Sequence, residues 1–131
     1  MDINEFDKMQ HERNLYQLAI DFDGVIHKSS KSFHDGTIYD DPVDGVEEAL
    51  KQLSKDYILI IYTCKANPER PLIGGKTGIE LIWDWLRKYD LDLYIGDIVY
   101  GKPNAKYYID DKAIKFTSWN QVIREIDAQK N

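Results

Sequence analysis

Cysteine is almost absent from this sequence, and long apolar runs are missing altogether. The single cysteine, Cys64, excludes a disulfide within the chain and any zinc site built from several cysteines. No apolar run approaches the roughly 20 residues that cross a bilayer. The first eight residues carry neither a basic head nor an apolar stretch, so no signal peptide is expected. We therefore expect a protein of the reduced cytoplasm, without a membrane partner.

Basic residues are also in the minority. The chain has 17 Lys and Arg against 23 Asp and Glu, a formal net charge of −6, so non-specific coating of nucleic acid is not expected. Its 131 residues suit one domain, and no repeat or low-complexity tract divides them. Residues 1–14 are polar and charged, which predicts a loosely ordered N-terminal arm or a frayed helix. The oligomeric state is not predicted.

Short apolar runs predict the strands of the fold. Residues 15–20 are apolar with little alternation, which suits a parallel strand buried on both faces. The strongest run covers residues 57–62, and shorter strands are expected near 91–95 and at 107–109. Polar segments and helix signals separate these runs. The alternation of strands and helices predicts an α/β fold with a mostly parallel sheet.

Helix starts are marked by residues that cap free backbone N–H groups. Asp41 as N-cap and Pro42 at the first position predict a helix with one apolar stripe, formed by Val43, Val46, Leu50 and Leu53. Two further helices begin at capping boxes, in which Glu or Gln follows a Thr or Ser by three residues: Thr77 with Glu80, and Ser118 with Gln121. Of the tryptophans on these helices, Trp83 and Trp119 match apolar stripes and are interpreted as core, whereas Trp85 is expected to be partly exposed.

Carboxylates gather at the ends of the predicted strands, where ligands bind in parallel sheets. Asp21 and Asp23 are two residues apart and can face the same cleft, and Gly24 would let the backbone turn. Asp110 and Asp111 also follow a strand. Either group alone suits a simple turn, but four carboxylates meeting in one cleft would repel one another unless a cation joined them, and an all-oxygen set suits Mg²⁺.

Two further polar residues gain meaning from their positions. Thr63 ends the strongest strand, where its hydroxyl can donate to a phosphoryl oxygen or simply pack as a β-branched residue. Lys102 lies in a Gly-Lys-Pro turn, which either aims its ammonium inward or leaves it in solvent.

The order of these motifs along the chain resembles the haloacid dehalogenase-like (HAD) phosphohydrolase superfamily. The resemblance covers residues 18–111: a strand into Asp-x-Asp-Gly-Val, a strand into Thr, a Lys, and a strand into Asp-Asp. It implies a single Rossmann-like domain, with a mostly parallel sheet and helices on both faces. The segments between the motifs are short, which is similar to small capless members of the superfamily.

The same resemblance implies the roles of the site residues. Asp21 would be the nucleophile that forms an aspartyl-phosphate, and Asp23 the general acid and base, with a pKa raised by neighbouring negative charge. Thr63 and Lys102 would hold the phosphoryl oxygens. Mg²⁺ would be bound by Asp110, with Asp111, together with Asp21 and the backbone carbonyl of Asp23.

Some residues depart from the pattern or stay open. Cys64 and Lys65 follow Thr63 where many relatives have a small and then a polar residue; Cys64 is interpreted as a buried small hydrophobe, and Lys65 has no assigned role. Gly96-Asp97 is similar to a metal-binding acidic motif, but it precedes Lys102 in the chain. Asp110-Asp111 fits the order of the family's motifs better, so Asp97 is not assigned to the site. His27 and His34 are interpreted as solvated loop residues, with contact to substrate as the alternative.

Several functions remain open at this point. A Mg²⁺-dependent phosphatase leads, with a receiver-like signalling domain and a catalytically silent HAD-like binding module as alternatives. The order of the motifs argues against the receiver, and the presence of both Asp21 and Asp23 argues against the silent module. The substrate is unassigned and includes nucleotides and polynucleotide ends. The loops 27–34 and 65–76 are basic, which suits either a large polyanionic substrate or ordinary solvated charges, carried by Lys28, Lys31, Lys65, Arg70 and Lys76.

Overall fold

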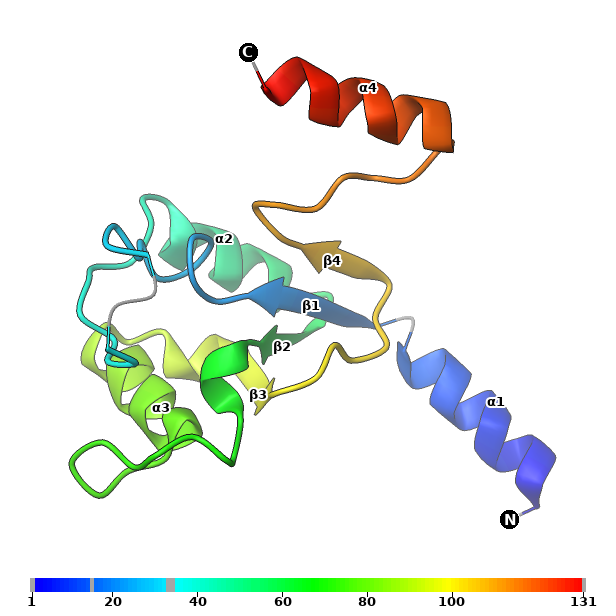
Figure 1. Cartoon of the computed structure of the whole chain (residues 1–131). Helices are drawn as coiled ribbons and strands as arrows, with labels where there is room; N and C mark the ends of the chain where they lie inside the picture. The colour runs from blue at the N-terminus through cyan, green and yellow to red at the C-terminus, as the bar shows by residue number, and fades with distance from the viewer. Residues whose placement is uncertain (1, 15, 33–34, 131) are drawn as a thin grey trace.

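A parallel sheet of four strands forms the centre of the computed structural model, which describes residues 2–14, 16–32 and 35–130. The strands are β1 (Gln17–Asp21), β2 (Ile58–Tyr62), β3 (Ile95–Val99) and β4 (Tyr107–Ile109). Their order across the sheet is β3-β2-β1-β4, so the first strand lies inside the sheet (Figure 1). The α/β fold with a parallel, Rossmann-like sheet is confirmed. Leu15, where the first strand was predicted to begin, lies outside the described residues.

Two helices pack on the same face of this sheet and form the core with it. They are α2 (Val46–Leu53) and α3 (Gly78–Lys88). The register pairs Leu18 with Leu59 and Ile20 with Ile61, so these four side chains share one face. They are buried in one cluster with residues of both helices: Leu50, Ile82, Trp85 and Leu86. The core therefore holds β1 and β2 firmly, and with them the polar residues that follow these strands.

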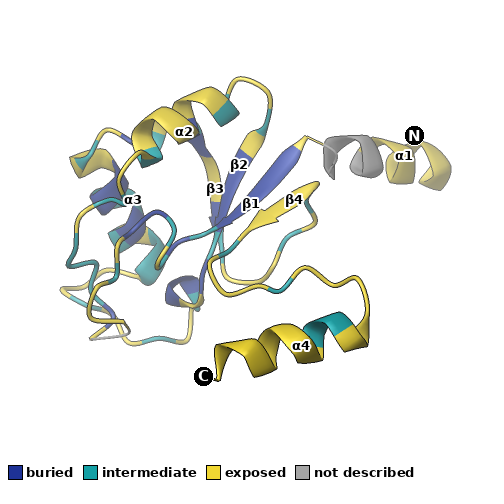
Figure 2. Cartoon of the chain, turned by 90° about the horizontal axis from the view of Figure 1, so that it is seen from above, coloured by how far each residue is buried: buried dark blue, intermediate teal, exposed yellow. Residues whose placement is uncertain are grey.

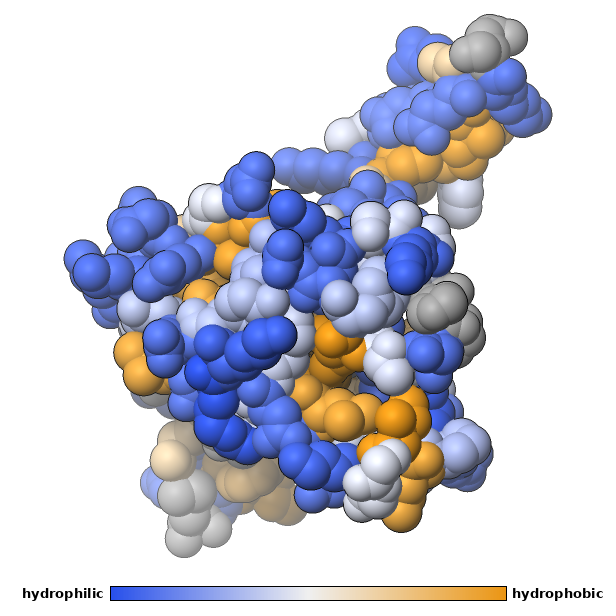
Figure 3. Space-filling model, turned by 90° about the vertical axis from the view of Figure 1, so that its left-hand side faces the viewer, coloured by the Kyte–Doolittle hydropathy of each residue, from blue (hydrophilic) through white to orange (hydrophobic). Residues whose placement is uncertain are grey.

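The C-terminal helix, α4 (Trp119–Gln129), lies apart from the sheet on the side opposite α2 and α3 (Figure 2). Helices thus lie on both sides of the sheet, but none of the described residues of α4 is buried. Its apolar side chains form a band on the projecting helix in Figure 3. The side chain of Trp119 is 72% exposed, so its interpretation as core was wrong.

The other two tryptophans are two residues apart on α3, so they lie on different faces of the helix, and they differ in burial. Trp85 is buried, although partial exposure was expected, because its indole N–H donates to the carbonyl of Asp40 and its ring contacts Phe22. Trp83 packs against the core from a partly buried position, as expected.

Two element boundaries differ from the sequence prediction. The helix predicted to start at Asp41 starts at Val46 instead, because Asp41 and Val43 make backbone hydrogen bonds to residues 28 and 26 and are therefore extended. The strand predicted near 91–95 begins only at Ile95, since residues 92–94 form a short 3₁₀ helix. The apolar Leu91 follows α3, and its N–H donates to the carbonyl of Leu86 in the last turn of that helix.

Capping explains the starts of the other helices. Thr77 and Glu80 form the predicted capping box, with each side chain accepting the other residue's backbone N–H. Ser118 caps α4 by accepting the N–H of Gln121, while the Gln121 side chain accepts from Thr117 instead of Ser118.

The N-terminal segment forms the helix α1 (Ile3–Asn14), whose residues 3–9 are exposed. The polar composition of this segment is in keeping with the exposure of residues 3–9. Within the described ranges, no helix is both long enough and apolar enough to cross a membrane.

Candidate functional site

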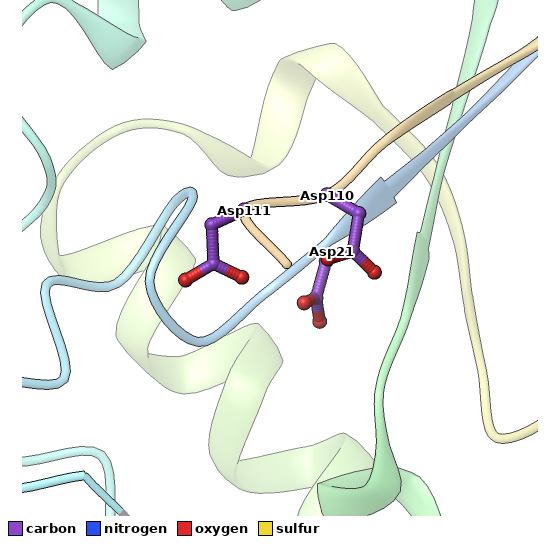
Figure 4. A group of neighbouring side chains, drawn as sticks. All are labelled: Asp21, Asp110 and Asp111. Atoms are coloured by element: carbon purple, nitrogen blue, oxygen red, sulfur yellow. The ribbon is translucent and has the colours of Figure 1, made fainter. Parts of the chain in front are cut away.

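Three carboxylates meet at the carboxyl edge of the sheet. Asp21 ends β1, and Asp110 and Asp111 follow the neighbouring parallel strand β4, so the topology brings them together. One oxygen from each lies within 4.8 Å of the others (Figure 4). We call these three residues the acidic group. Asp97 lies inside β3, beyond β2, and does not belong to this group within the described part of the chain.

Backbone and side-chain donors hold two members of the acidic group, Asp21 and Asp110, in place. The N–H of Phe22 donates to Asp21 Oδ1 at 2.8 Å, and the N–H of Lys112 donates to Asp110 Oδ1 at 2.7 Å. The hydroxyl of Tyr62, at the end of β2, donates to Asp110 Oδ2 at 3.1 Å. These contacts orient carboxylates that carry like charges.

Gly24 makes room for the third carboxylate. Its φ of +85° lies in the left-handed region, which glycine adopts without strain. A Cβ atom at this position would also collide with Oδ2 of Asp111. Both observations explain why glycine follows Asp23. The backbone at Gly24 can approach the Asp111 carboxylate closely only because this residue has no side chain.

The surroundings of Asp21 shift the pKa of its carboxyl group. Burial raises the pKa of Asp21 to about 6, with further contributions from Asp110 and Asp111, although the hydrogen bond from Phe22 opposes them. Burial and the nearby Asp110 likewise raise the pKa of the Tyr62 phenol. Burial is the main cause of both shifts, and a divalent cation bound among these oxygens would offset the smaller part that comes from the neighbouring carboxylates.

Asp23 has a different environment, because two nitrogen donors contact its carboxylate. His27 Nδ1 lies 2.8 Å from Oδ1, and Lys65 Nζ lies 2.9 Å from Oδ2. Both partners are buried, with side chains 0% and 3% exposed, whereas the side chain of Asp23 is 33% exposed. The interpretation of His27 as a solvated loop residue was therefore wrong. His34 lies outside the described residues.

The partners of Asp23 also reverse the expected direction of its pKa. Partial burial raises the pKa of Asp23, but the hydrogen bonds from His27 and Lys65 outweigh burial and lower it below its ordinary value. The expectation that neighbouring negative charge would raise this pKa was wrong. It is the pKa of Asp21 that is raised, mainly by burial and further by Asp110 and Asp111, whereas Asp23 rests as a carboxylate.

The turn after β2 explains how Lys65 reaches Asp23. Thr63 Oγ1 accepts the N–H of Lys65 at 3.2 Å and starts the 3₁₀ turn η1 (Cys64–Ala66). This turn exposes Cys64 and buries Lys65, so the interpretation of Cys64 as buried was wrong. Gly78 at the start of α3 permits the close packing, because a Cβ there would collide with the carbonyl of Lys65. The apolar run of residues 57–62 predicts the strand β2, but it does not indicate that a 3₁₀ turn follows the strand.

A cleft opens beside the acidic group with a volume of about 380 Å³. Its lining combines carboxylates with hydroxyl and ammonium groups, from Asp21, Asp23, Gly24, Lys28, Ser29, Ser32, Cys64, Asp111 and Lys112. Lys112 was not singled out in the sequence, although it directly follows the Asp-Asp pair. A small phosphorylated molecule fits a cleft of this size.

Two residues predicted to bind phosphate do not line this cleft. Thr63 is buried behind it, and its hydroxyl oxygen caps the 3₁₀ turn. The exposed Lys102 places its ammonium 4.2 Å from the centre of the Tyr108 ring, a cation–π contact. A phosphate-binding role for either residue stays a prediction.

Several basic side chains of the two loops contact other residues of the chain, which their sequence does not indicate. Lys65 is paired with Asp23, and Lys76 forms an ion pair with Asp84. Lys31 lies over the ring of Tyr39, 5.5 Å from its centre. Among the basic residues of the two loops, Lys28 lines the cleft. Fewer positive charges are therefore available to attract a polyanion than the number of lysines in these loops indicates.

Comparison of the chain with protein-family models, with curated proteins and with solved structures finds no match. The function of this chain is therefore inferred from its own residues. The features that bear on it are the acidic group, Asp23 with its two buried partners, and the adjoining cleft.

Proposed function

We propose that this protein is a Mg²⁺-dependent phosphomonoester hydrolase that acts through an aspartyl-phosphate on Asp21. The observation that carries the proposal is the position of the acidic group at the carboxyl edge of the sheet, where two of its members, Asp21 and Asp111, line a cleft together with Asp23 and two lysines. The order of the motifs, which resembles that of HAD phosphohydrolases, supports the same function.

The residues present fit a divalent cation. Asp21, Asp110 and Asp111 would hold it through carboxylate oxygens, the ligands that Mg²⁺ prefers. The raised pKa of Asp21 and the space left by Gly24 for Asp111 are the observations that favour a cation here. Bound Mg²⁺ would offset the negative charge of the phosphoryl oxygens and of the attacking carboxylate.

The reaction divides into two displacements at phosphorus. A carboxylate oxygen of Asp21 forms a bond to phosphorus, the bond from phosphorus to the leaving oxygen breaks, and the alcohol departs with a proton from the protonated fraction of Asp23. A water molecule then attacks the same phosphorus and passes a proton to Asp23. Inorganic phosphate leaves, and the Asp21 carboxylate is restored.

The cleft supplies groups that bind the substrate. Lys28 and Lys112 bring positive charge, and Ser29 and Ser32 bring hydroxyl groups, to the lining. These groups suit the oxygens of one phosphate on a small molecule. We propose a small phosphomonoester as the substrate, with a nucleotide or a polynucleotide end as the alternative. The exposed thiol of Cys64 suits a reducing compartment, so the proposal includes the cytoplasm.

The topology counts against a receiver-like signalling domain. Receivers have the flavodoxin-like strand order 2-1-3-4-5, in which the first strand lies between the second and the third. Here β1 lies between β2 and β4. A silent binding module has no specific observation in its favour, since Asp21 and Asp23 both line the cleft.

A panel of phosphomonoesters, assayed with Mg²⁺ and with excess chelator, tests the proposal. We expect Mg²⁺-dependent release of inorganic phosphate that Asp21→Asn lowers by several orders of magnitude. The matched control is Asp97→Asn, which removes an acidic side chain from the same sheet but outside the acidic group. Equal activity of the two variants, or full activity in chelator, would contradict the proposal.

A further inference from the structure

His27 is a fully buried imidazole with a hydrogen-bonding partner on each ring nitrogen. Nδ1 lies 2.8 Å from Asp23 Oδ1, and Nε2 accepts the backbone N–H of Asp40 at 3.0 Å. Because an amide N–H can only donate, Nε2 carries no proton in this arrangement. The neutral ring therefore has its proton on Nδ1 and donates it to the carboxylate of Asp23.

Aromatic rings fix the orientation of this imidazole. Phe22 stacks on it with ring centres 5.4 Å apart and planes 10° apart. The rings of Tyr39 and Trp85 meet it edge to face, with centres 5.1 and 5.5 Å away. With three rings around it, His27 can neither flip nor move without disturbing the core, so its two hydrogen bonds are directed rather than incidental.

The second partner, Asp40, closes the loop that lines the cleft. Its carboxylate accepts the N–H of Ser30 at 2.9 Å, and its carbonyl accepts the indole N–H of Trp85 at 2.9 Å. Ser30 lies in the segment 28–32, which supplies Lys28, Ser29 and Ser32 to the cleft. His27 thus connects Asp23, the proposed general acid and base, with Asp40, which holds the segment 28–32 beside the cleft.

We propose that His27 is a positioning residue with two separable tasks. Its Nδ1–H fixes the rotamer of Asp23 for proton transfer, while Nε2 accepts the N–H of Asp40 and so anchors the segment 28–32, which Asp40 holds through Ser30. Lys65 holds the other oxygen of Asp23, so the carboxylate is clamped from both sides. The inference rests on the proposed phosphatase function and goes beyond it by assigning one residue to both the proton transfer and the substrate loop.

Two conservative variants separate the tasks, because each keeps one of the two nitrogen positions. The amide nitrogen of Asn lies near the position of Nδ1, so His27→Asn retains a donor to Asp23 but loses the acceptor for Asp40. The longer Gln places its amide near Nε2, so His27→Gln retains a partner for Asp40 but loses the donor to Asp23.

We expect the two variants to change different kinetic constants, kcat in His27→Gln and KM in His27→Asn. For an alkyl phosphate, His27→Gln should lower kcat at least about tenfold with KM little changed, since only part of the roughly 100-fold or larger acid-base contribution is lost. His27→Asn should raise KM several-fold with kcat within about threefold of wild type. An activated aryl phosphate, which leaves without a proton, should lose much less kcat in His27→Gln.

Outcomes against the inference are distinct from those against the proposed function. A wild type that is inactive on the whole panel contradicts both. An active wild type whose two variants change kcat and KM alike, or not at all, contradicts only the role of His27. If either variant fails to fold, the ¹⁵N NMR signals of the His27 ring in the wild type still decide: a proton on Nδ1 is expected, and a proton on Nε2 would overturn the inference.

Discussion

Raising the pH in the absence of divalent cations should destabilise this protein, because Asp21 is easier to protonate in the folded state than in the unfolded state. Burial, together with Asp110 and Asp111, raises the pKa of Asp21 from its ordinary value of 3.8 to about 6. The protonated carboxyl therefore favours the folded state. Its stabilisation is complete below pH 3.8 and is lost as the pH rises through about 6.

The magnitude follows from the gap between the two pKa values. At about 1.36 kcal/mol for each pKa unit, a gap from 3.8 to 6 corresponds to about 3 kcal/mol. Asp21 keeps some contact with water, which screens its neighbours, so we expect about 1–2 kcal/mol. Asp23 acts outside this window, because its lowered pKa changes stability only at more acidic pH.

Urea unfolding at a series of pH values, with chelator present, measures this effect. Between pH 4.5 and 7.5 the free energy of unfolding of the wild type should fall by about 1–2 kcal/mol relative to that of Asp21→Asn, which cannot ionise at this position. Added Mg²⁺ should restore stability at pH 7.5 and much less at pH 4.5, where protons compete for Asp21. Parallel pH curves for the wild type and Asp21→Asn would refute the reasoning.

Three further outcomes are expected. Ca²⁺ should support little turnover in place of Mg²⁺, because its longer bonds and looser geometry would displace Asp21 from in-line attack, and equal rates with both ions would contradict this. Asp23→Asn should lower kcat for alkyl phosphates more than for activated aryl phosphates, and equal losses would argue against an acid-base role. In urea unfolding, Trp85→Ala should cost about 3–5 kcal/mol and Trp119→Ala less than about 0.5 kcal/mol, since only Trp85 is buried; similar losses would place Trp119 in the core.

The residues of the acidic group were predictable because they follow strands. Apolar runs located β1, β2 and β4, and parallel strands bring their carboxyl ends to one edge, so Asp21 and the Asp110–Asp111 pair were expected at the same edge. Only the strand order of the structure makes β1 and β4 direct neighbours. The capping box at Thr77 was equally local, since it needs only two side chains three residues apart.

The partners of Asp23 could not be predicted in the same way. Lys65 is buried only because a 3₁₀ turn after β2 points it inward, and that turn depends on the close approach of Gly78. His27 is buried because three aromatic rings from different segments surround it. Such positions result from tertiary packing, which neither composition nor periodicity records. The exposed apolar stripe of α4 is the opposite case. Periodicity predicts that a helix has an apolar face, but it does not predict whether another element covers that face.

The most direct test of the central claim is to trap the covalent intermediate on Asp21. The wild type is mixed with Mg²⁺ and a ³²P-labelled phosphomonoester that the panel has identified as a substrate, and the reaction is quenched with acid during turnover. We expect labelled protein whose label is released by hydroxylamine, as for an acyl phosphate. The label should map to Asp21, and it should be absent from Asp21→Asn but present in Asp97→Asn. An active enzyme that carries no label, or carries it on another residue, would contradict the account.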